Sequence, residues 1–176
     1  GLTLIVIISI FGPISGAHFN PIVSLVFWLK RMMSFKDFIA YVVMQISGAI
    51  FGCIVANIIF KLPPVTISTL VRHDFSQFLS EILATFGLIL VIFIGSEVSK
   101  QNIPVLVGSY IASAYWFTSS TSFANPAVTV ARQFSDTFTG ISPSGVPTFI
   151  IAQIFGAILG FIFIQWLTNT VIESGY

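Results

Sequence analysis

The sequence predicts an all-α membrane protein, built as an inverted repeat of transmembrane helices with two re-entrant half-helices. Three observations predict this fold. The 176 residues are 56% hydrophobic and only 7% charged, with a mean hydropathy of +1.00, whereas a soluble domain carries about 25% charged residues. Several apolar runs approach the ~20 residues that a helix needs to cross a bilayer. Finally, two Asn-Pro pairs interrupt apolar segments, and the sequence that follows them is repeated.

Charge and cysteine content argue against several classes of protein. The net charge is +1, and no basic patch is present that could neutralise phosphates, so nucleic acid is not an expected partner. The one cysteine, Cys53, follows Gly52 in an apolar run and is interpreted as a small packing residue rather than a reactive thiol. No segment with the pattern of a secretory signal peptide opens the sequence.

Four segments are long and apolar enough, or nearly so, to be predicted as spans: Phe38–Phe60, Phe78–Ile94, Ile103–Phe117 and Phe149–Val171. The opening run, Leu2–Ile14, is too short to span alone and is interpreted as the back part of a helix. Basic residues lean weakly towards the connection that holds Lys30, Arg31 and Lys36, which we therefore place in the cytoplasm.

A repeated unit follows each Asn-Pro pair. It begins 25 residues after the first Asn and 28 after the second, and its four shared positions are Gln45, Gly48, Ala49 and Gly52 in one copy and Gln153, Gly156, Ala157 and Gly160 in the other. An odd number of spans in each copy would place the copies in opposite orientations, a pattern common in transport proteins. The repeat therefore predicts two inverted halves.

The repeat also predicts the organisation of the chain. We expect a truncated first repeat at 1–60 (end of TM2, half-helix 20–31, TM3), an extracellular or periplasmic loop at 61–77, and a second repeat at 78–176 (TM4, TM5, half-helix 125–135, TM6). Glu81 precedes Asn125 by 44 residues, and counting back 44 from Asn20 runs off the start. The first helix and the start of the second are therefore expected to be missing.

Each Asn-Pro pair is predicted to begin a half-helix inside the membrane. Asn is a favoured N-cap, and Pro suits the first helical position. From Asn20 to Arg31 such a helix is roughly 17 Å long, about half the hydrocarbon thickness. Two inverted copies would meet tip to tip at the midplane, where their positive ends repel cations and the amides of Asn20 and Asn125 can donate to a neutral oxygen. The alternative is a pair of kinked packing helices with buried Asn.

These motifs resemble those of the aquaporin and glycerol-facilitator family. The resemblance rests on Ser15-Gly-Ala-His18-Phe-Asn20-Pro21-Ile22, on Phe123-Ala-Asn125-Pro126-Ala127, on Glu81-Ile-Leu-Ala-Thr85-Phe86 and on the two glycine-notched spans. It covers the whole chain except the missing front. It implies six spans with two half-helices, a homotetramer with one pore per subunit, and passive conduction without a cofactor or metal.

Two residues depart from the family pattern, one at the midplane and one at the constriction that is expected to act as the selectivity filter. Ile22 stands where the family usually has Ala, and its bulk would narrow or reshape the midplane. Val128 stands where the family normally places an Arg, so the constriction is expected to be wider and to exclude charge less strongly. By the same resemblance Ser113 and Ser122 are the other filter residues, although Ser113 is nearly as well explained by ordinary helix packing.

Three further residues are expected to support this site. Arg132 lies one turn beyond Val128 and is expected to pair with Asp136 at i+4; the alternative is that it replaces the missing cation near the pore mouth. Glu81 is a lone carboxylate in a span, which marks a functional group by default, but the family resemblance favours support of the signature-loop backbone. His18 is interpreted as a hydrogen-bonded loop anchor, not a relay or metal ligand.

The predicted function is a multi-pass channel of the inner or plasma membrane for water and small uncharged solutes such as polyols. The segment from Asn125 to Arg132, with 135–138 after it, most resembles the bacterial aquaglyceroporins associated with arsenic resistance, which implies neutral or methylated arsenicals as solutes. An ion-coupled secondary transporter is the alternative, because it too uses broken helices. An enzyme is not expected, because the sequence shows no paired carboxylates, metal cluster or activated nucleophile.

Overall fold

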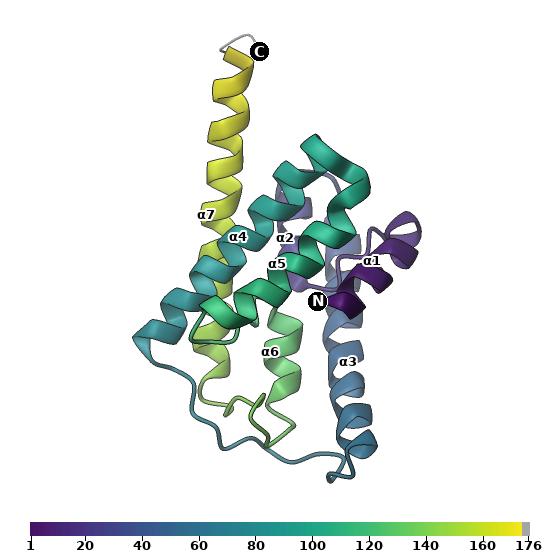
Figure 1. Ribbon diagram of the computed structural model, residues 1–176, viewed down its shortest axis with the longest axis vertical. Coiled ribbons are helices and arrows are strands. Elements are labelled where there is room, and N and C mark those ends of the chain that lie inside the picture. The colour runs from purple at the N-terminus through teal and green to yellow at the C-terminus, as the bar shows by residue number, and fades with distance from the viewer. Residues whose placement is uncertain (174–176) are drawn as a thin grey trace.

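The computed structural model describes residues 1–173, whose regular elements are all helices, with no strand among these residues (Figure 1). The all-α prediction is therefore confirmed; the last three residues of the expected second repeat, 174–176, lie outside the described residues. The elements are, in order, α1 (Leu2–Ser15), α2 (Pro21–Leu29), α3 (Phe35–Ile59), α4 (Phe75–Ser99), the 3-10 turn η1 (Lys100–Asn102), α5 (Ile103–Phe117), α6 (Pro126–Arg132) and α7 (Val146–Glu173).

Long apolar helices form the frame of the molecule. In the described residues three helical stretches are long and apolar enough to cross a membrane: Phe35–Ile59, Phe75–Phe117 (α4, η1 and α5 together) and Val146–Asn169. The exposed side chains of α3 include Ile39, Val43 and Phe51. A soluble protein rarely leaves such a continuous apolar face in water, so these faces are suited to lipid.

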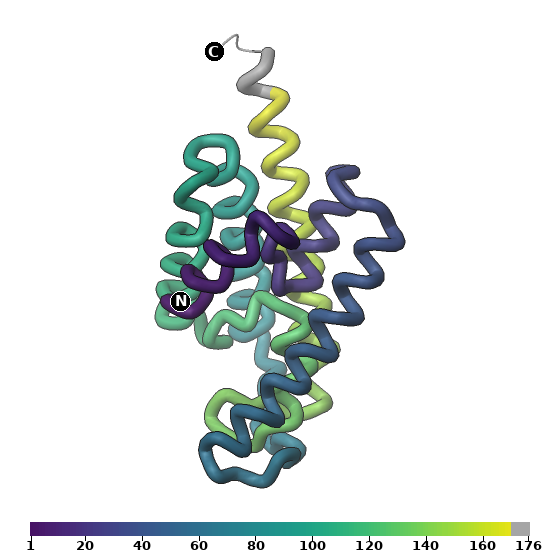
Figure 2. Tube along the Cα trace, turned by 90° about the vertical axis from the view of Figure 1, so that its right-hand side faces the viewer, coloured from purple at the N-terminus to yellow at the C-terminus, as the bar shows by residue number. Residues whose placement is uncertain are grey.

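The two short helices lie between the long ones. α2 packs against α3 and α7, and α6 packs against the same two helices. In both ribbon and tube views α2 lies on one side of the middle of the molecule and α6 on the other (Figures 1 and 2). At about 1.5 Å per residue neither helix can cross a bilayer, and both fall inside the segments 20–31 and 125–135 expected from the Asn-Pro pairs.

Glycines allow α4 and α7 to pack closely. A Cβ atom added at Gly156 of α7 would meet the backbone oxygen of Ile82 and lie 3.0 Å from the Thr85 Cβ; one added at Gly160 would lie 3.0 Å from Ile89 Cγ2. Small residues at such positions let helices in membranes approach each other. The glycine notch therefore fixes the distance between the helix that carries Glu81 and the last helix.

We expect Gly156→Ala to destabilise the protein, because the backbone of α4 cannot move aside as a side-chain end can. The cost should be roughly 1–3 kcal/mol, typical of overpacking. Thermal unfolding in detergent measures it. The matched control is Gly95→Ala, whose added Cβ meets only the Cδ1 atoms of Ile103 and Leu106, at 3.0 and 3.2 Å. Equal melting temperatures for the two variants would contradict the prediction.

Candidate functional site

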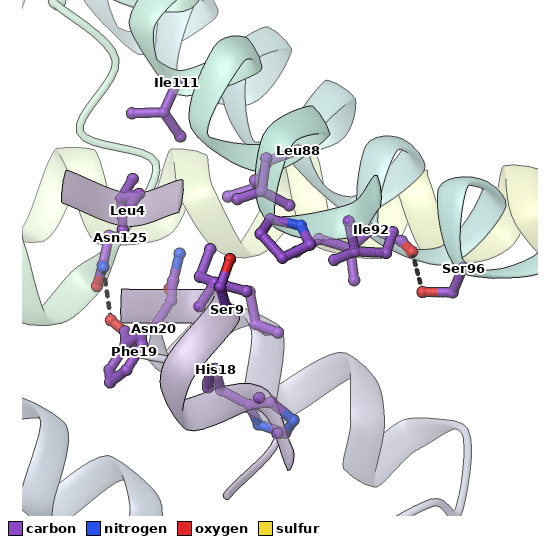
Figure 3. A pocket seen from close by; sticks show the side chains of 18 of the residues that line it. Leu4, Ser9, His18, Phe19, Asn20, Leu88, Ile92, Ser96, Ile111 and Asn125 are labelled. Carbon is purple, nitrogen blue, oxygen red and sulfur yellow. Dashed lines mark hydrogen bonds between the residues drawn. The ribbon is translucent and has the colours of Figure 1, made fainter. Parts of the chain in front are cut away.

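The two Asn-Pro loops are joined by a reciprocal pair of hydrogen bonds. The Asn20 Oδ1 accepts from the Ile22 N–H at 3.0 Å, and its Nδ2 donates to the Ala124 carbonyl at 2.8 Å. The Asn125 Oδ1 accepts from the Ala127 N–H at 3.0 Å, and its Nδ2 donates to the Phe19 carbonyl at 3.0 Å (Figure 3). Each Asn thus caps its own helix and holds the residue that precedes the other Asn.

The backbone before each Asn follows the same unusual path. Positive φ angles occur at matching positions four, three and one residues before the Asn: Gly16 (74°) and Thr121 (61°), Ala17 (48°) and Ser122 (49°), Phe19 (47°) and Ala124 (45°). Non-glycine residues adopt this region at a cost and do so where the surrounding structure fixes them. Because the two loops match angle by angle, the symmetry in the sequence extends to the backbone.

A buried carboxylate holds the second loop. Glu81 is fully buried, and its two oxygens accept from the N–H groups of Phe123 and Ala124, both at 2.8 Å. The Gln153 Nε2 donates to the same carboxylate at 2.7 Å and to the Thr129 hydroxyl at 2.9 Å. A carboxylate with several N–H partners can remain buried, and here it fixes the turn into α6.

The first loop has a related support built from neutral groups. The Gln45 Nε2 donates to the Ser24 hydroxyl at 3.0 Å, and His18 Nδ1 lies 3.0 Å from the same oxygen. Ser24 and Thr129 both come four residues after their Asn, and Gln45 and Gln153 are the repeated glutamines. His18 also packs beside the Phe27 ring, with centroids 4.2 Å apart. His18 therefore lies in the loop as a hydrogen-bonded group.

A cavity of about 650 Å³ runs past both loops (Figure 3). It lies among α1, α2, α4, α5 and α6. Six of the residues selected from the sequence line it: His18, Asn20, Ser122, Asn125, Val128 and Arg132. The structure thus brings both Asn side chains and two of the three expected filter residues to one cavity.

Other selected residues lie elsewhere. Pro21, Pro126 and Ala127 are buried in the packing around their helices and do not line this cavity. Ser113 is exposed on α5, where its hydroxyl donates to the Ser109 carbonyl at 2.8 Å. Because Ser113 is not among the residues that line the cavity, the structure does not bring it to the expected filter.

Ile22 also departs from expectation. Its side chain is 2% exposed and packs in a cluster with Val26, Ile89, Phe93 and Ala157, between α2, α4 and α7. The expectation that Ile22 narrows the midplane is therefore corrected. The bulk of this side chain fills the core behind α2, and the neighbouring residues Val23 and Asn20 line the cavity instead.

The expected ion pair between Arg132 and Asp136 is also corrected. Asp136 Oδ1 accepts from the backbone N–H and the hydroxyl of Thr69, at 2.9 and 3.1 Å. The Arg132 guanidinium lies over the Phe123 ring, 4.3 Å from its centroid. The α3–α4 connection competes successfully for Asp136, because it places a backbone donor and a hydroxyl on one oxygen.

Arg72 is a structural residue that sequence reasoning missed. Its side chain is buried and donates to three backbone carbonyls: to Gly140 at 2.8 Å, to Phe138 at 2.9 Å and to Ser120 at 3.2 Å. Burial lowers the pKa of its guanidinium and Glu81 opposes the shift, but arginine stays protonated in proteins. The sequence offered no clear signal of this role, because Arg72 stands beside His73 and Asp74 in an ordinary polar connection.

These features define a class of protein. A cavity flanked by two broken helices, in a chain of long apolar helices, is the arrangement of membrane channels and transporters. In the described residues no group of three or more His, Cys, Asp or Glu side chains is placed to hold a metal ion.

Comparison with known proteins gives the family. The model of the family described as major intrinsic protein matches residues 1–120. The aquaglyceroporin AqpS of Rhizobium meliloti (strain 1021) is 49% identical over 167 residues, which are 95% of this chain and 72% of AqpS. Aquaporin NIP1-1 of Arabidopsis thaliana is 27% identical over 97% of this chain, and human Aquaporin-4 is 28% identical over 89%.

The chain belongs to the major intrinsic protein family, the family of aquaporin and aquaglyceroporin membrane channels. It spans 60% of the length of NIP1-1 and 46% of that of Aquaporin-4. The resemblance predicted from the Asn-Pro motifs is confirmed.

Proposed function

We propose that this protein is a passive channel for water and small uncharged solutes such as glycerol. The observation that carries the proposal is the position of both Asn side chains on the wall of one cavity. An Asn amide nitrogen has two hydrogens, and the bond to the opposite loop uses one of them. The second is free to donate to a solute oxygen that passes between the two half-helices.

The proposed filter is wide. Val128 and Ser122 line the cavity near Asn125, and the Ser122 hydroxyl is buried without a hydrogen-bond partner in the described structure. That hydroxyl is closed off from solvent, so the lining acts through its size: neither side chain is large, which leaves room for a polyol. This supports polyols and neutral or methylated arsenicals as solutes, the latter resting on the sequence of 125–132 alone.

We further propose that the protein works as a homotetramer in the inner or plasma membrane. The exposed apolar faces of α3, α4 and α7 supply surface for both lipid and neighbouring subunits. In this arrangement residues 1–60 and 78–176 are the two inverted halves, and the connection 61–77 faces the outside. Lys30, Arg31 and Lys36 face the cytoplasm.

The test is osmotic swelling of liposomes that contain the protein, with water, glycerol and arsenous acid as separate probes. We expect rates above those of empty liposomes, proportional to the solute gradient and indifferent to imposed sodium or proton gradients. Uptake that saturates and follows an ion gradient would instead identify a coupled transporter. Rates equal to those of empty liposomes for all three probes would refute the proposed function.

A further inference from the structure

In each Asn-Pro loop a side chain holds the backbone carbonyl five residues before the Asn. In the first loop the Tyr41 hydroxyl donates to the Ser15 carbonyl at 2.7 Å. In the second loop the Arg72 Nη1 donates to the Ser120 carbonyl at 3.2 Å. Both serines stand five residues before the Asn of their loop. The two halves therefore hold the same carbonyl, but they take the donor from different elements.

The internal repeat explains why the second half takes its donor from elsewhere. Tyr41 lies on α3, four residues before the repeated Gln45. The residue four before Gln153 on α7 is Phe149, which is fully buried. Phenylalanine has no hydroxyl and cannot donate this hydrogen bond. The connection between α3 and α4 supplies the donor instead.

Ser120 links this contact to the residues that line the cavity. It is fully buried, and its hydroxyl accepts from the Ser122 N–H at 3.1 Å. Thr121 and Ser122 have φ angles of 61° and 49°, a region that non-glycine residues keep only where surrounding contacts fix the backbone. Ser122 and Phe123 line the cavity. The held carbonyl of Ser120 is thus the start of the strained segment that places Ser122 in the filter.

The strained segment is held at its two ends by groups of opposite charge. At one end Glu81 accepts from the N–H groups of Phe123 and Ala124. At the other end the Arg72 guanidinium donates to the Ser120 carbonyl. Hydrogen bonds to charged groups are stronger than those between neutral groups. The loss of either support should therefore let the segment between them shift.

The Arg72 guanidinium is itself anchored to the connection between α6 and α7. Its Nε donates to the Gly140 carbonyl at 2.8 Å, and its Nη2 donates to the Phe138 carbonyl at 2.9 Å. The planar fork of arginine holds these donors in fixed directions. Arg72 is not among the described residues that line the cavity. It can therefore act on a solute only through the backbone that it positions.

We propose that Arg72 is a positioning residue for the filter: by holding the Ser120 carbonyl it fixes Ser122 in the cavity wall and so sets the largest solute that passes. This inference rests on the proposed channel function. Arg72 takes the place of the tyrosine hydroxyl that holds the equivalent carbonyl in the other half.

The ratio of erythritol flux to glycerol flux tests this role. Erythritol is one carbon longer than glycerol, and a ratio does not depend on how much of the protein is folded. We would measure liposome swelling with the wild type, Arg72→Met, Arg72→Lys and Lys61→Met. Methionine keeps a long side chain but has no donor. Lys61→Met is the matched control, because Lys61 is an exposed cation of the same connection.

We expect Arg72→Met to raise the erythritol-to-glycerol ratio by about fivefold, the scale of one lost hydrogen bond, because the strained segment relaxes. Arg72→Lys should raise the ratio too, since a compact ammonium lacks the fixed fork that reaches three carbonyls. Lys61→Met should leave the ratio unchanged. Phe149→Tyr added to Arg72→Met should lower the ratio again, because its hydroxyl would stand where Tyr41 holds the equivalent carbonyl.

Two results would overturn the inference. One is an unchanged ratio in Arg72→Met, or in Arg72→Lys if the methionine variant does not fold; a lower flux of both solutes would then show that Arg72 only stabilises the fold. The other is a folded double variant whose ratio stays as high as that of Arg72→Met. A wild type that passes neither water nor glycerol would instead refute the proposed function itself.

Discussion

Replacing Val128 by arginine is expected to lower glycerol permeability by about tenfold or more, equivalent to roughly 1.4 kcal/mol of added barrier, and to lower water permeability far less. Val128 lies on the cavity wall together with Ser122 and Asn125. The longer side chain of arginine would project across the passage at this level. Water needs less width than a polyol, so the variant should reduce glycerol permeability much more than water permeability.

The added charge also matters at this position. The arginine introduced at position 128 would stand four residues from Arg132 on the same helix, where like charges destabilise by a few tenths of a kcal/mol. That cost is small beside the packing of α6 against α3 and α7. We therefore expect the variant to fold and the loss of glycerol flux to report on the passage.

Stopped-flow swelling with glycerol and with water measures both rates on one preparation. Val128→Leu is the matched control, because it adds apolar volume without reach or charge and should reduce glycerol flux only slightly. If Val128→Arg conducts glycerol as fast as the wild type, then Val128 does not lie at the narrowest level, and the wide-filter proposal fails.

The parts of the site that could be predicted from sequence obey local rules. Asn before Pro is an N-cap followed by a favoured first residue, so the starts of α2 and α6 followed from two adjacent residues. The repeated glutamines, Gln45 and Gln153, pointed to equivalent places, and each does contact the residue four after its Asn. Local chemistry and internal symmetry together were sufficient here.

The parts of the site that could not be predicted depend on which face of each helix turns towards the cavity. α2 is apolar nearly all round, with Pro21, Ile22, Val23 and Val26 all buried, so its sequence has no polar side that could show which residue lines the cavity. Ile22 was therefore assigned to the passage although it lies in the core. A helix of this kind is oriented by its neighbours, and the pattern within it carries no such information.

Contacts between loops that are far apart in the sequence could not be predicted either. Asp136 was expected to pair with Arg132 because they are four apart, but the competing Thr69 is 67 residues away. Arg72 finds carbonyls 48 to 68 residues away. These partners are set by how the 60–74 and 133–145 connections fold together, since Thr66 and Ser68 donate to the carbonyls of Phe134 and Gln133.

Glu81→Gln is expected to produce the largest loss of stability. The two carboxylate oxygens accept from the N–H groups of Phe123 and Ala124, and Gln153 donates as well. A glutamine side chain offers one oxygen and an NH₂ group, so one donor would face another donor in a fully buried site. Leaving a buried group unpaired in this way costs on the order of 3 kcal/mol when the lost partner was charged.

The lost hydrogen bond should also reduce conduction, because it loosens the second Asn-Pro loop. Phe123 and Ala124 precede Asn125, and the Ala124 carbonyl accepts from Asn20, so a loosened turn would release the contact between the loops. We expect Glu81→Gln to lower the unfolding temperature in detergent and to reduce the flux of water and glycerol together. Glu97→Gln, at an exposed position of the same helix, should change neither. A Glu81→Gln variant that melts like the wild type but loses conduction would show that the carboxylate acts on the solute path directly, because a purely supporting group cannot be removed without cost to the loop it holds.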